Sequence, residues 1–153
     1  MSCPKELDQI ARDLINGGSR WFKGNRQYFT VLRAFIRDKG VCVYCGKDLW
    51  EKFGVASCGD HLLPKSGYPD RAEDVDNRVA ACAECNHIKR NFDPSGNKVV
   101  ERPITDEVRL ELIRKAGEEI NKRRRDSGWE GEFQTAKRQF QEAVAKYRDC
   151  GGC

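Results

Sequence analysis

Histidine is scarce in this 153-residue chain, which has only two, His61 and His87. A catalytic zinc ion held by three histidines therefore cannot be built from one copy of this sequence. No arrangement of serine, histidine and aspartate typical of a nucleophilic hydrolase stands out either. Any histidine chemistry must therefore depend on one imidazole acting beside other residue types.

Long apolar runs are also missing. No stretch approaches the roughly 18 consecutive apolar residues that a membrane-spanning helix needs. The first ten residues are charged and lack the apolar stretch of a signal peptide. We therefore expect a cytoplasmic protein that does not enter a membrane and whose thiols stay reduced.

Apolar residues in general are limited. They make up 39% of the chain against 34% charged residues, and the mean hydropathy is −0.75. A chain of this length and composition predicts one small domain, or a small module with helical flanks. A structural metal would compensate for a small core, because its binding free energy contributes to folding.

Cysteine, by contrast, is abundant, with eight residues in the chain. Four of them form two tight pairs, Cys42-Val-Tyr-Cys45 and Cys82-Ala-Glu-Cys85, and Gly46 follows the first pair. Two such CxxC pairs predict a closed tetrahedral zinc site with four thiolate ligands. A disulfide framework is the alternative interpretation of eight cysteines.

The other four cysteines are Cys3, Cys58, Cys150 and Cys153. The last two form another CxxC pair, but no second pair at zinc spacing remains to complete a site with it. Free thiols, or a second zinc site that uses Cys3 or Cys58, both remain open at this point.

A set of polar residues accompanies the two cysteine pairs. Between the pairs lie Asp60-His61, then Pro64 and Asn77, and Cys85 is followed by Asn86-His87-Ile88-Lys89. This combination resembles the four-cysteine, zinc-containing branch of the HNH endonuclease family, and the resemblance covers residues 42–91. It implies an α+β fold in which a zinc-stapled ββα-metal (HNH) module is flanked by N- and C-terminal helices.

The resemblance also implies an activity, the metal-dependent hydrolysis of phosphodiester bonds in nucleic acid. DNA is preferred over RNA as the substrate, and the products carry 5′-phosphate ends. His61 is then the general base, and Asp60 and Asn86 are oxygen ligands of a catalytic Mg²⁺ or Mn²⁺. Asn77 fastens the loop that precedes it to the histidine strand and orients the base.

Two further residues of the motif are site candidates. Lys89 lies three residues after Asn86, on the same helix face, where it could hold a phosphate oxygen. His87 is rotated by about 100° from Asn86, so it is the weaker metal ligand and is expected to contact substrate beside the cofactor site.

Two other functions remain open. One is an RNA-directed nuclease toxin, since phosphate contacts do not distinguish DNA from RNA. The other is a non-catalytic zinc module that binds nucleic acid or a protein. A bacterial or phage origin is implied by the resemblance alone, and protein partners are not specified.

Hydrophobic periodicity predicts the remaining elements. Helices are expected over residues 5–15, 25–39, 83–91, 105–125 and 132–148, with Thr105 as an N-cap. Short strands are expected over 41–45, 57–62 and 78–81, with a loop over 64–76. We expect an N-terminal helical flank over 1–40, the module over 41–93 and a C-terminal helical extension over 94–153, all in one compact domain.

Charge is distributed unevenly over these three parts. The formal net charge is +4 for residues 1–40, −2 for residues 41–93 and +2 for residues 94–153. Because the module itself is acidic, attraction to phosphate must come from a bound cation and from the flanks. The basic clusters there are Arg20, Lys23 and Arg26, and Lys122-Arg123-Arg124-Arg125.

Overall fold

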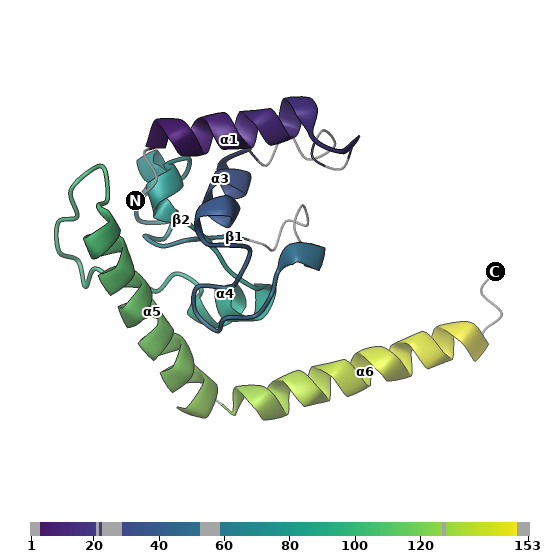
Figure 1. Cartoon of the computed structure of the whole chain (residues 1–153). Coiled ribbons are helices and arrows are strands. Elements are labelled where there is room, and N and C mark those ends of the chain that lie inside the picture. The colour runs from purple at the N-terminus through teal and green to yellow at the C-terminus, as the bar shows by residue number, and fades with distance from the viewer. Residues whose placement is uncertain (1–3, 21, 23–28, 53–58, 127, 150–153) are drawn as a thin grey trace. The chain divides into compact units, whose positions relative to one another are not determined.

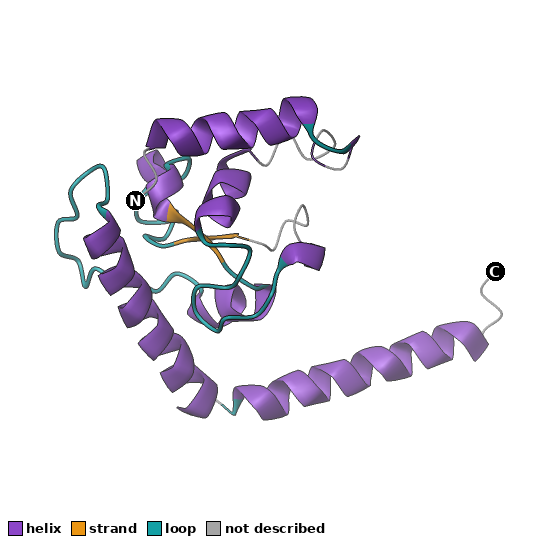
Figure 2. Cartoon of the chain, viewed as in Figure 1, coloured by secondary structure: helices purple, strands orange, loops and turns teal. Residues whose placement is uncertain are grey.

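The computed structural model describes residues 4–20, 22, 29–52, 59–126 and 128–149. Contacts divide the chain into two compact units, Met1–Ile120 and Asn121–Cys153. This division falls inside a long helix, Asp106–Asp126, and the three-part organisation in one domain that the sequence suggests stays a prediction. Figure 1 labels the helices and strands, and Figure 2 colours them by type.

The elements follow one another in the order helix, helix, strand, strand, helix, helix, helix, with short 3₁₀ turns between some of them. Their bounds are α1 Pro4–Gly17, α3 Phe29–Arg37, β1 Gly59–His61, β2 Arg78–Ala80, α4 Ala83–Lys89, α5 Asp106–Asp126 and α6 Trp129–Asp149, with 3₁₀ turns at Trp50–Lys52, Pro69–Arg71 and Val75–Asn77. The order β1, β2, α4 is the ββα unit that the sequence predicted, and the α+β class is confirmed.

The sheet consists of two short antiparallel strands. Gly59 pairs with Ala80, Asp60 with Val79 and His61 with Arg78. Neighbouring side chains on a strand point to opposite faces, so this register places Asp60 and His61 on different sides of the sheet. β1 ends at His61, as the sequence required if both residues were to serve one pocket.

Helices α1 and α3 cover part of the sheet. α1 buries a stripe of Leu7, Ala11 and Ile15, which are spaced four residues apart and therefore share one helix face. α3 packs against α1 and against β2 (Figure 2). The apolar periodicity of both segments is thus used for core packing.

A second cluster of buried apolar side chains lies beyond the sheet. Its members come from the segment after β1, from β2, from the segment that precedes α5 and from α5 itself: Leu62, Leu63, Val79, Val100, Ile104 and Leu112. The chain after the module therefore belongs to the same core, up to the middle of α5.

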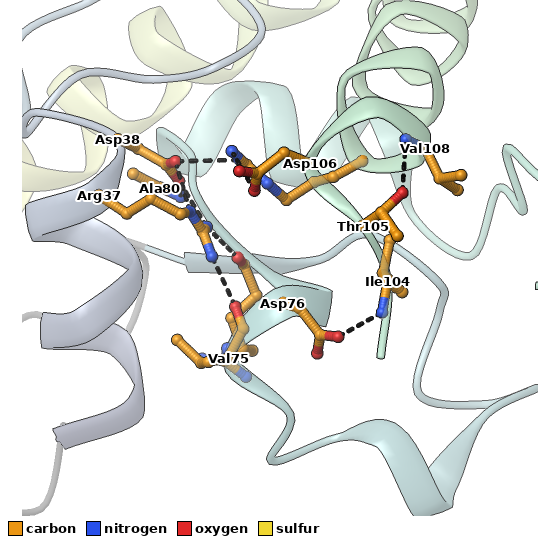
Figure 3. A network of polar contacts seen from close by, with 11 residues as sticks. Arg37, Asp38, Val75, Asp76, Ala80, Ile104, Thr105, Asp106 and Val108 are labelled. Carbon is orange, nitrogen blue, oxygen red and sulfur yellow. Dashed lines mark hydrogen bonds and ion pairs between the residues drawn. The ribbon is translucent and has the colours of Figure 1, made fainter. Parts of the chain in front are cut away.

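A polar network joins the end of α3 to β2 and to α5 (Figure 3). Asp38 accepts hydrogen bonds from the Ala80 amide at 2.9 Å and from the Arg109 guanidinium at 3.2 Å. Arg37 donates to the Val75 carbonyl oxygen at 2.7 Å and forms an ion pair with Asp38 at 2.9 Å. Most of these groups are shielded from water, so the network connects α3, β2 and α5 in the interior of the protein.

The start of α5 is held in the same region. Asp76 accepts a hydrogen bond from the Ile104 amide, and Thr105 Oγ accepts one from the Val108 amide at 3.3 Å (Figure 3). The second contact is the N-cap that the sequence predicted for this helix. The Asp76 contact anchors the segment just before α5 to the loop that leads into β2, whereas the Thr105 contact is local to the first turn of α5.

One local prediction needs correction. Residues 41–45 do not form a strand: Val41 makes an isolated bridge with Asp48, and the chain between them turns tightly. The Cys42 amide donates to the Lys47 carbonyl oxygen, and the Gly46 amide, at φ +74°, donates to the Cys42 carbonyl oxygen. Of the residues in this turn, Val43 bonds to β2 through its amide, to the Ala80 carbonyl oxygen at 3.0 Å.

Parts of other predictions lie outside the described residues. The helix expected from residue 25 is seen from Phe29 onward, and the strand expected from residue 57 is seen from Gly59 onward. Cys3, Cys58, Cys150 and Cys153 also lie outside the described residues. In the described part of the chain, no helix is long and apolar enough to cross a membrane.

The second unit contains the end of α5 and the whole of α6. α6 is 21 residues long and, between Gly131 and Tyr147, has exposed side-chain positions throughout except at half-buried Val144. The described side chains of α6 therefore form no buried apolar face within the second unit.

Candidate functional site

Four cysteine side chains meet where the turn before β1 approaches the start of α4. The sulfur atoms of Cys42, Cys45, Cys82 and Cys85 all lie within 4.8 Å of one another, and those of Cys45 and Cys82 are 3.8 Å apart. A tetrahedral zinc ion with Zn–S bonds of about 2.3 Å holds its sulfur ligands about 3.8 Å apart. Within the described residues, no other group of three or more His, Cys, Asp or Glu side chains is close enough to share an ion.

The protonation of these thiols also fits a cation. The Cys42 thiol donates to the Cys82 sulfur, and this hydrogen bond raises the pKa of Cys42 to about 11. The pKa of Cys82 is lowered because its sulfur accepts from Cys42 and from Cys85. With protons alone the cluster thus stabilises one thiolate, whereas a divalent ion would stabilise four. The donor set and its spacing therefore fit zinc.

Asp60 lies in the middle of β1 and is buried, with 5% of its surface exposed. Its Oδ2 atom accepts a hydrogen bond from the Tyr44 hydroxyl at 2.7 Å and lies 3.1 Å from the Lys89 ammonium. Burial and the Asp60 charge raise the pKa of Tyr44 well above its usual value, so the phenol stays a donor. The carboxylate is therefore held in one orientation by two contacts on the same oxygen.

Lys89 differs from the expectation that it holds a phosphate oxygen. Its side chain is fully buried, and its ammonium donates to the His61 carbonyl oxygen at 2.8 Å besides pairing with Asp60. A buried ammonium needs such partners, because an unpaired one would lose its hydration without compensation. In this structure Lys89 connects α4 to β1 and compensates the Asp60 charge.

His61, the last residue of β1, is half-buried on the other side of the strand. Its Nε2 atom lies 3.0 Å from the Ala72 carbonyl oxygen and 2.6 Å from the Arg78 guanidinium. Burial, and secondly the Arg78 charge, lower the pKa of His61 below its ordinary 6.5. The imidazole is therefore neutral at pH 7 and has a nitrogen lone pair that can accept a proton.

Asn77 is fully buried at the entrance to β2. Its Oδ1 accepts from the Leu63 amide at 2.7 Å, and its Nδ2 donates to the carbonyl oxygens of Leu63 at 3.1 Å and Arg71 at 3.2 Å. The Asn77 carbonyl also accepts from the Leu62 amide at 2.8 Å. The side chain thus joins both ends of the loop to the residues that follow His61, which is the positioning role expected for it.

Asn86 and His87 open toward solvent at the start of α4. The Asn86 Nδ2 atom donates to the Gly59 carbonyl oxygen at 3.3 Å. Gly59 directly precedes Asp60 in β1, so this contact places the Asn86 side chain beside the strand that carries Asp60. His87 is exposed, and both residues line a shallow hollow of about 330 Å³ together with Ala83 and Arg90. Of the two, Asn86 is the one whose contacts reach the strand that carries Asp60.

Sequence reasoning missed Tyr44 and Arg78. Tyr44 stands between the two cysteines of the first pair, and Arg78 directly follows Asn77 and faces His61 across the sheet. The adjacency of Arg78 to Asn77 was visible, but its contact with His61 depends on strand register, which the sequence does not specify for strands of three residues.

A cavity of about 1020 Å³ lies away from these residues. It is bounded by the end of α3, the segment 73–76 and the segment 102–109, and four arginines are matched there by four acidic residues. None of the site residues predicted from the sequence lines it. We assign the candidate site to the ββα unit, because the reactive groups converge there and the cavity has no net charge to attract phosphate.

Comparison with known proteins agrees with this assignment. The family model described as HNH endonuclease matches residues 42–92, a third of the chain. No curated protein and no solved structure matches the sequence. Residues 42–92 therefore match the HNH endonuclease family model, and within them Cys42, Cys45, Cys82 and Cys85 are positioned to form a zinc site.

Proposed function

We propose that the protein is a metal-dependent endonuclease that hydrolyses phosphodiester bonds, with DNA preferred over RNA and 5′-phosphate ends as products. The observation that carries the proposal is the neutral, half-buried imidazole of His61 at the end of β1, in the same unit as Asp60 and Asn86. A base of this kind can accept a proton near neutral pH, as the attack of water on phosphorus requires.

His61 would act as the general base. When Nε2 carries the proton, it donates to the Ala72 carbonyl oxygen, and Nδ1 then holds the lone pair that takes the proton of the attacking water. The Asn77 side chain holds Leu63, two residues after His61, through a hydrogen bond to its amide. Arg78 places a positive charge beside the imidazole. The Arg78 guanidinium would also attract the phosphate that is to be cleaved.

Asp60 and Asn86 would hold the catalytic cation. Both known contacts of the Asp60 carboxylate fall on Oδ2, so Oδ1 is the atom we propose as ligand, together with Oδ1 of Asn86. Two oxygen donors completed by water suit Mg²⁺ or Mn²⁺, which when bound would stabilise charge on the phosphate and on the leaving oxygen. Lys89 would then orient Asp60 rather than contact the substrate.

Incubating the zinc-loaded protein with supercoiled plasmid and with single-stranded RNA tests the activity. We expect plasmid cleavage with Mg²⁺ or Mn²⁺, none in EDTA, and a loss on the order of 10² to 10⁴ in rate for His61→Ala. The zinc content and melting curve of His61→Ala serve as the control for folding. Cleavage of RNA alone would instead identify an RNA-directed nuclease.

The assignment of the cation to Asn86 has its own test. Metal titrations of cleavage should show that Asn86→Ala needs a higher Mg²⁺ or Mn²⁺ concentration for half-maximal cleavage, because a ligand is lost, and that His87→Ala, the matched neighbour on the same helix, changes little. If His87→Ala abolishes metal-dependent cleavage while Asn86→Ala retains it, the ligand lies one residue further along the chain. A preference for Ni²⁺ or Co²⁺ would support the imidazole as well.

A non-catalytic zinc module is the second candidate function, and one observation favours it. The Asp60 carboxylate is already paired with the buried Lys89 ammonium, so the site is balanced without a cation. Binding of nucleic acid without cleavage under any metal condition, by protein that retains its zinc, would decide for this function.

The basic end of α5 is our candidate for phosphate contact. Lys122 and Arg125 are exposed in the last turns of this helix, beside Arg123 and Arg124. Replacing Arg123, Arg124 and Arg125 with alanine should weaken binding to all sequences about equally and flatten its salt dependence, because such contacts release counterions without reading bases. Unchanged affinity would leave these residues as favourable charges at a helix C-terminus.

A further inference from the structure

Helix α6 exposes three aromatic side chains at intervals of seven residues. Phe133, Phe140 and Tyr147 have 45%, 69% and 65% of their surfaces exposed. Seven residues correspond to almost two full turns of an α-helix, so the three rings lie along one face (α6 in Figure 1). An aligned row of exposed aromatic residues is unusual on a protein surface and marks an interaction site.

The spacing within this row is that of a short coiled coil. If the aromatic residues occupy the a positions of a heptad, Ala136 and Ala143 occupy the d positions between them. The face opposite to this stripe contains Arg138 and Ala145 at f positions. One edge of the apolar stripe is formed by the g positions, which are Glu132, Gln139 and Lys146.

A helix with this pattern gains little from remaining alone. In water, isolated helices of this length are marginal, and most helical stability in proteins comes from burying an apolar face. The described residues of α6 bury no such face, and their ion pair Arg138–Glu142 lies within the helix itself at 3.8 Å. The pattern therefore points to a partner helix.

We propose that α6 pairs with α6 of a second copy of this chain as an antiparallel coiled coil. In an antiparallel pair an a residue of one helix packs against a d residue of the other, so two of the three rings would face a small alanine: Phe133 against Ala143 of the second copy, and Phe140 against its Ala136. Tyr147 would face Trp129 of the second copy at the end of the pair. In a parallel pair the rings would crowd one another in the a layers and leave space in the alanine layers.

Charge along the edges agrees with this orientation. In the same alignment the g positions face each other, which brings Glu132 opposite Lys146 of the second copy, twice per dimer because of the two-fold symmetry. Gln139 faces its own counterpart near the axis. Lys137, on the other edge, also faces its counterpart, and this like-charge contact limits the affinity.

Sedimentation equilibrium of the full-length, zinc-loaded protein tests the proposal. We expect a concentration-dependent monomer–dimer equilibrium, and Phe140→Glu should weaken dimerisation by about tenfold or more, because it places a carboxylate in the apolar seam. Ala145→Glu adds the same charge on the opposite face of the same helix and should leave the equilibrium unchanged. Lys137→Gln should strengthen the dimer.

Charge reversal tests the orientation. Glu132→Lys and Lys146→Glu should each weaken the dimer, and the double variant should restore it, because the pair is reformed with its signs exchanged. Failure of the double variant to restore association would overturn the antiparallel alignment. A wild-type chain that stays monomeric at all concentrations, or a Phe140→Glu dimer as strong as the wild type, would overturn the proposal altogether.

Other occupants of the stripe have distinct signatures. A monomer whose affinity for DNA falls in Phe140→Glu and not in Ala145→Glu would assign the stripe to nucleic acid, since aromatic rings stack on bases. A monomer whose thermal stability falls in the same comparison would assign it to packing within the chain. Either result would contradict self-association. None of these variants changes a residue of the HNH domain.

Discussion

The two ends of the ββα unit differ in whether the protein's own residues balance the charges of the site without a metal ion. At the cysteine end, four soft donors already stand at the distances that a zinc ion would impose. At the other end, Asp60 is neutralised by Lys89, and His61 contacts a backbone carbonyl and an arginine. The first site needs its ion in order to hold its charge, whereas the second is balanced before any ion or substrate arrives.

This difference separates stability from activity within about 50 residues. A site whose ligands cannot all ionise without a cation contributes to folding through that cation. A site whose charges are paired internally can bind and release a cation without unfolding, because its metal-free form contains no unpaired buried charge. The predictions below test this division.

The largest effect should come from the cysteine end. Cys82→Ser should remove about one zinc ion per chain and unfold the HNH domain, because structural zinc contributes roughly 10–16 kcal/mol, comparable to the whole stability of a small domain. Zinc content and thermal denaturation measure this. Cys150→Ser, which changes a cysteine outside the matched residues 42–92, is the control and should keep both. A native melting curve for zinc-free Cys82→Ser would abolish the proposed division.

Breaking the internal ion pair should come next. Lys89→Met leaves the Asp60 carboxylate buried without its cation and should cost about 3–5 kcal/mol of unfolding free energy, while zinc stays bound. The double variant Asp60→Asn with Lys89→Met should recover part of that loss, because no unpaired charge remains. Denaturant titrations of the single and double variants provide the comparison. A loss near 1 kcal/mol or less for Lys89→Met would be typical of an exposed pair and would contradict the buried geometry.

Removing the loop clamp should have a smaller effect on stability and a clear effect on activity. Asn77→Ala leaves the Leu63 amide and carbonyl groups without partners and should cost about 1–3 kcal/mol. Since the clamp holds the chain beside His61, we expect cleavage to fall more than substrate binding does. Asn77→Asp keeps an acceptor for the Leu63 amide but turns a carboxylate oxygen toward the carbonyl oxygens of Leu63 and Arg71, so it should lose more stability than Asn77→Ala. A smaller loss in Asn77→Asp would show that the two donated hydrogen bonds are unimportant.

The smallest effect concerns the pH dependence of cleavage. Because burial and Arg78 lower the pKa of His61, the rate should rise with pH through a midpoint below the ordinary histidine value of 6.5. Replacing Arg78 with glutamine removes the second cause, so the midpoint should move upward. A downward movement would contradict the electrostatic role of Arg78.

The same pKa shift has a consequence for stability. The unfolded chain binds a proton at His61 at a higher pH than the folded chain does, so this residue favours unfolding as the pH falls through about 6.5 and below. The His61→Ala variant should lack this contribution. Urea titrations at neutral and mildly acidic pH would measure the difference between the two proteins.

Much of the first unit was predictable from the sequence. The apolar stripes of α1 and α3, the Thr105 cap of α5 and the order of β1, β2 and α4 all follow from local patterns. The zinc site was predictable because the spacing of cysteine pairs alone constrains the ligand geometry. Local sequence is informative where one element or one turn determines the result.

The remaining features depend on contacts between distant segments. The Tyr44–Asp60 hydrogen bond and the pairing of Arg78 with His61 arise from how the first turn and β2 meet β1, which no local pattern states. The sequence placed Lys89 on the same helix face as Asn86 but not inside the protein, because helical spacing gives direction and not depth of burial.

The Asn77 clamp separates the loop before β2 into a fixed base and a free tip. Its hydrogen bonds hold Leu63 at one end and Arg71 at the other, whereas Lys65, Ser66 and Gly67 form an exposed turn. A change in length at that turn alters a surface loop whose two ends are already joined, and the entropic cost of a longer loop grows only slowly. The tip is therefore the place where this scaffold can accept inserted residues that read a substrate while His61 keeps its position.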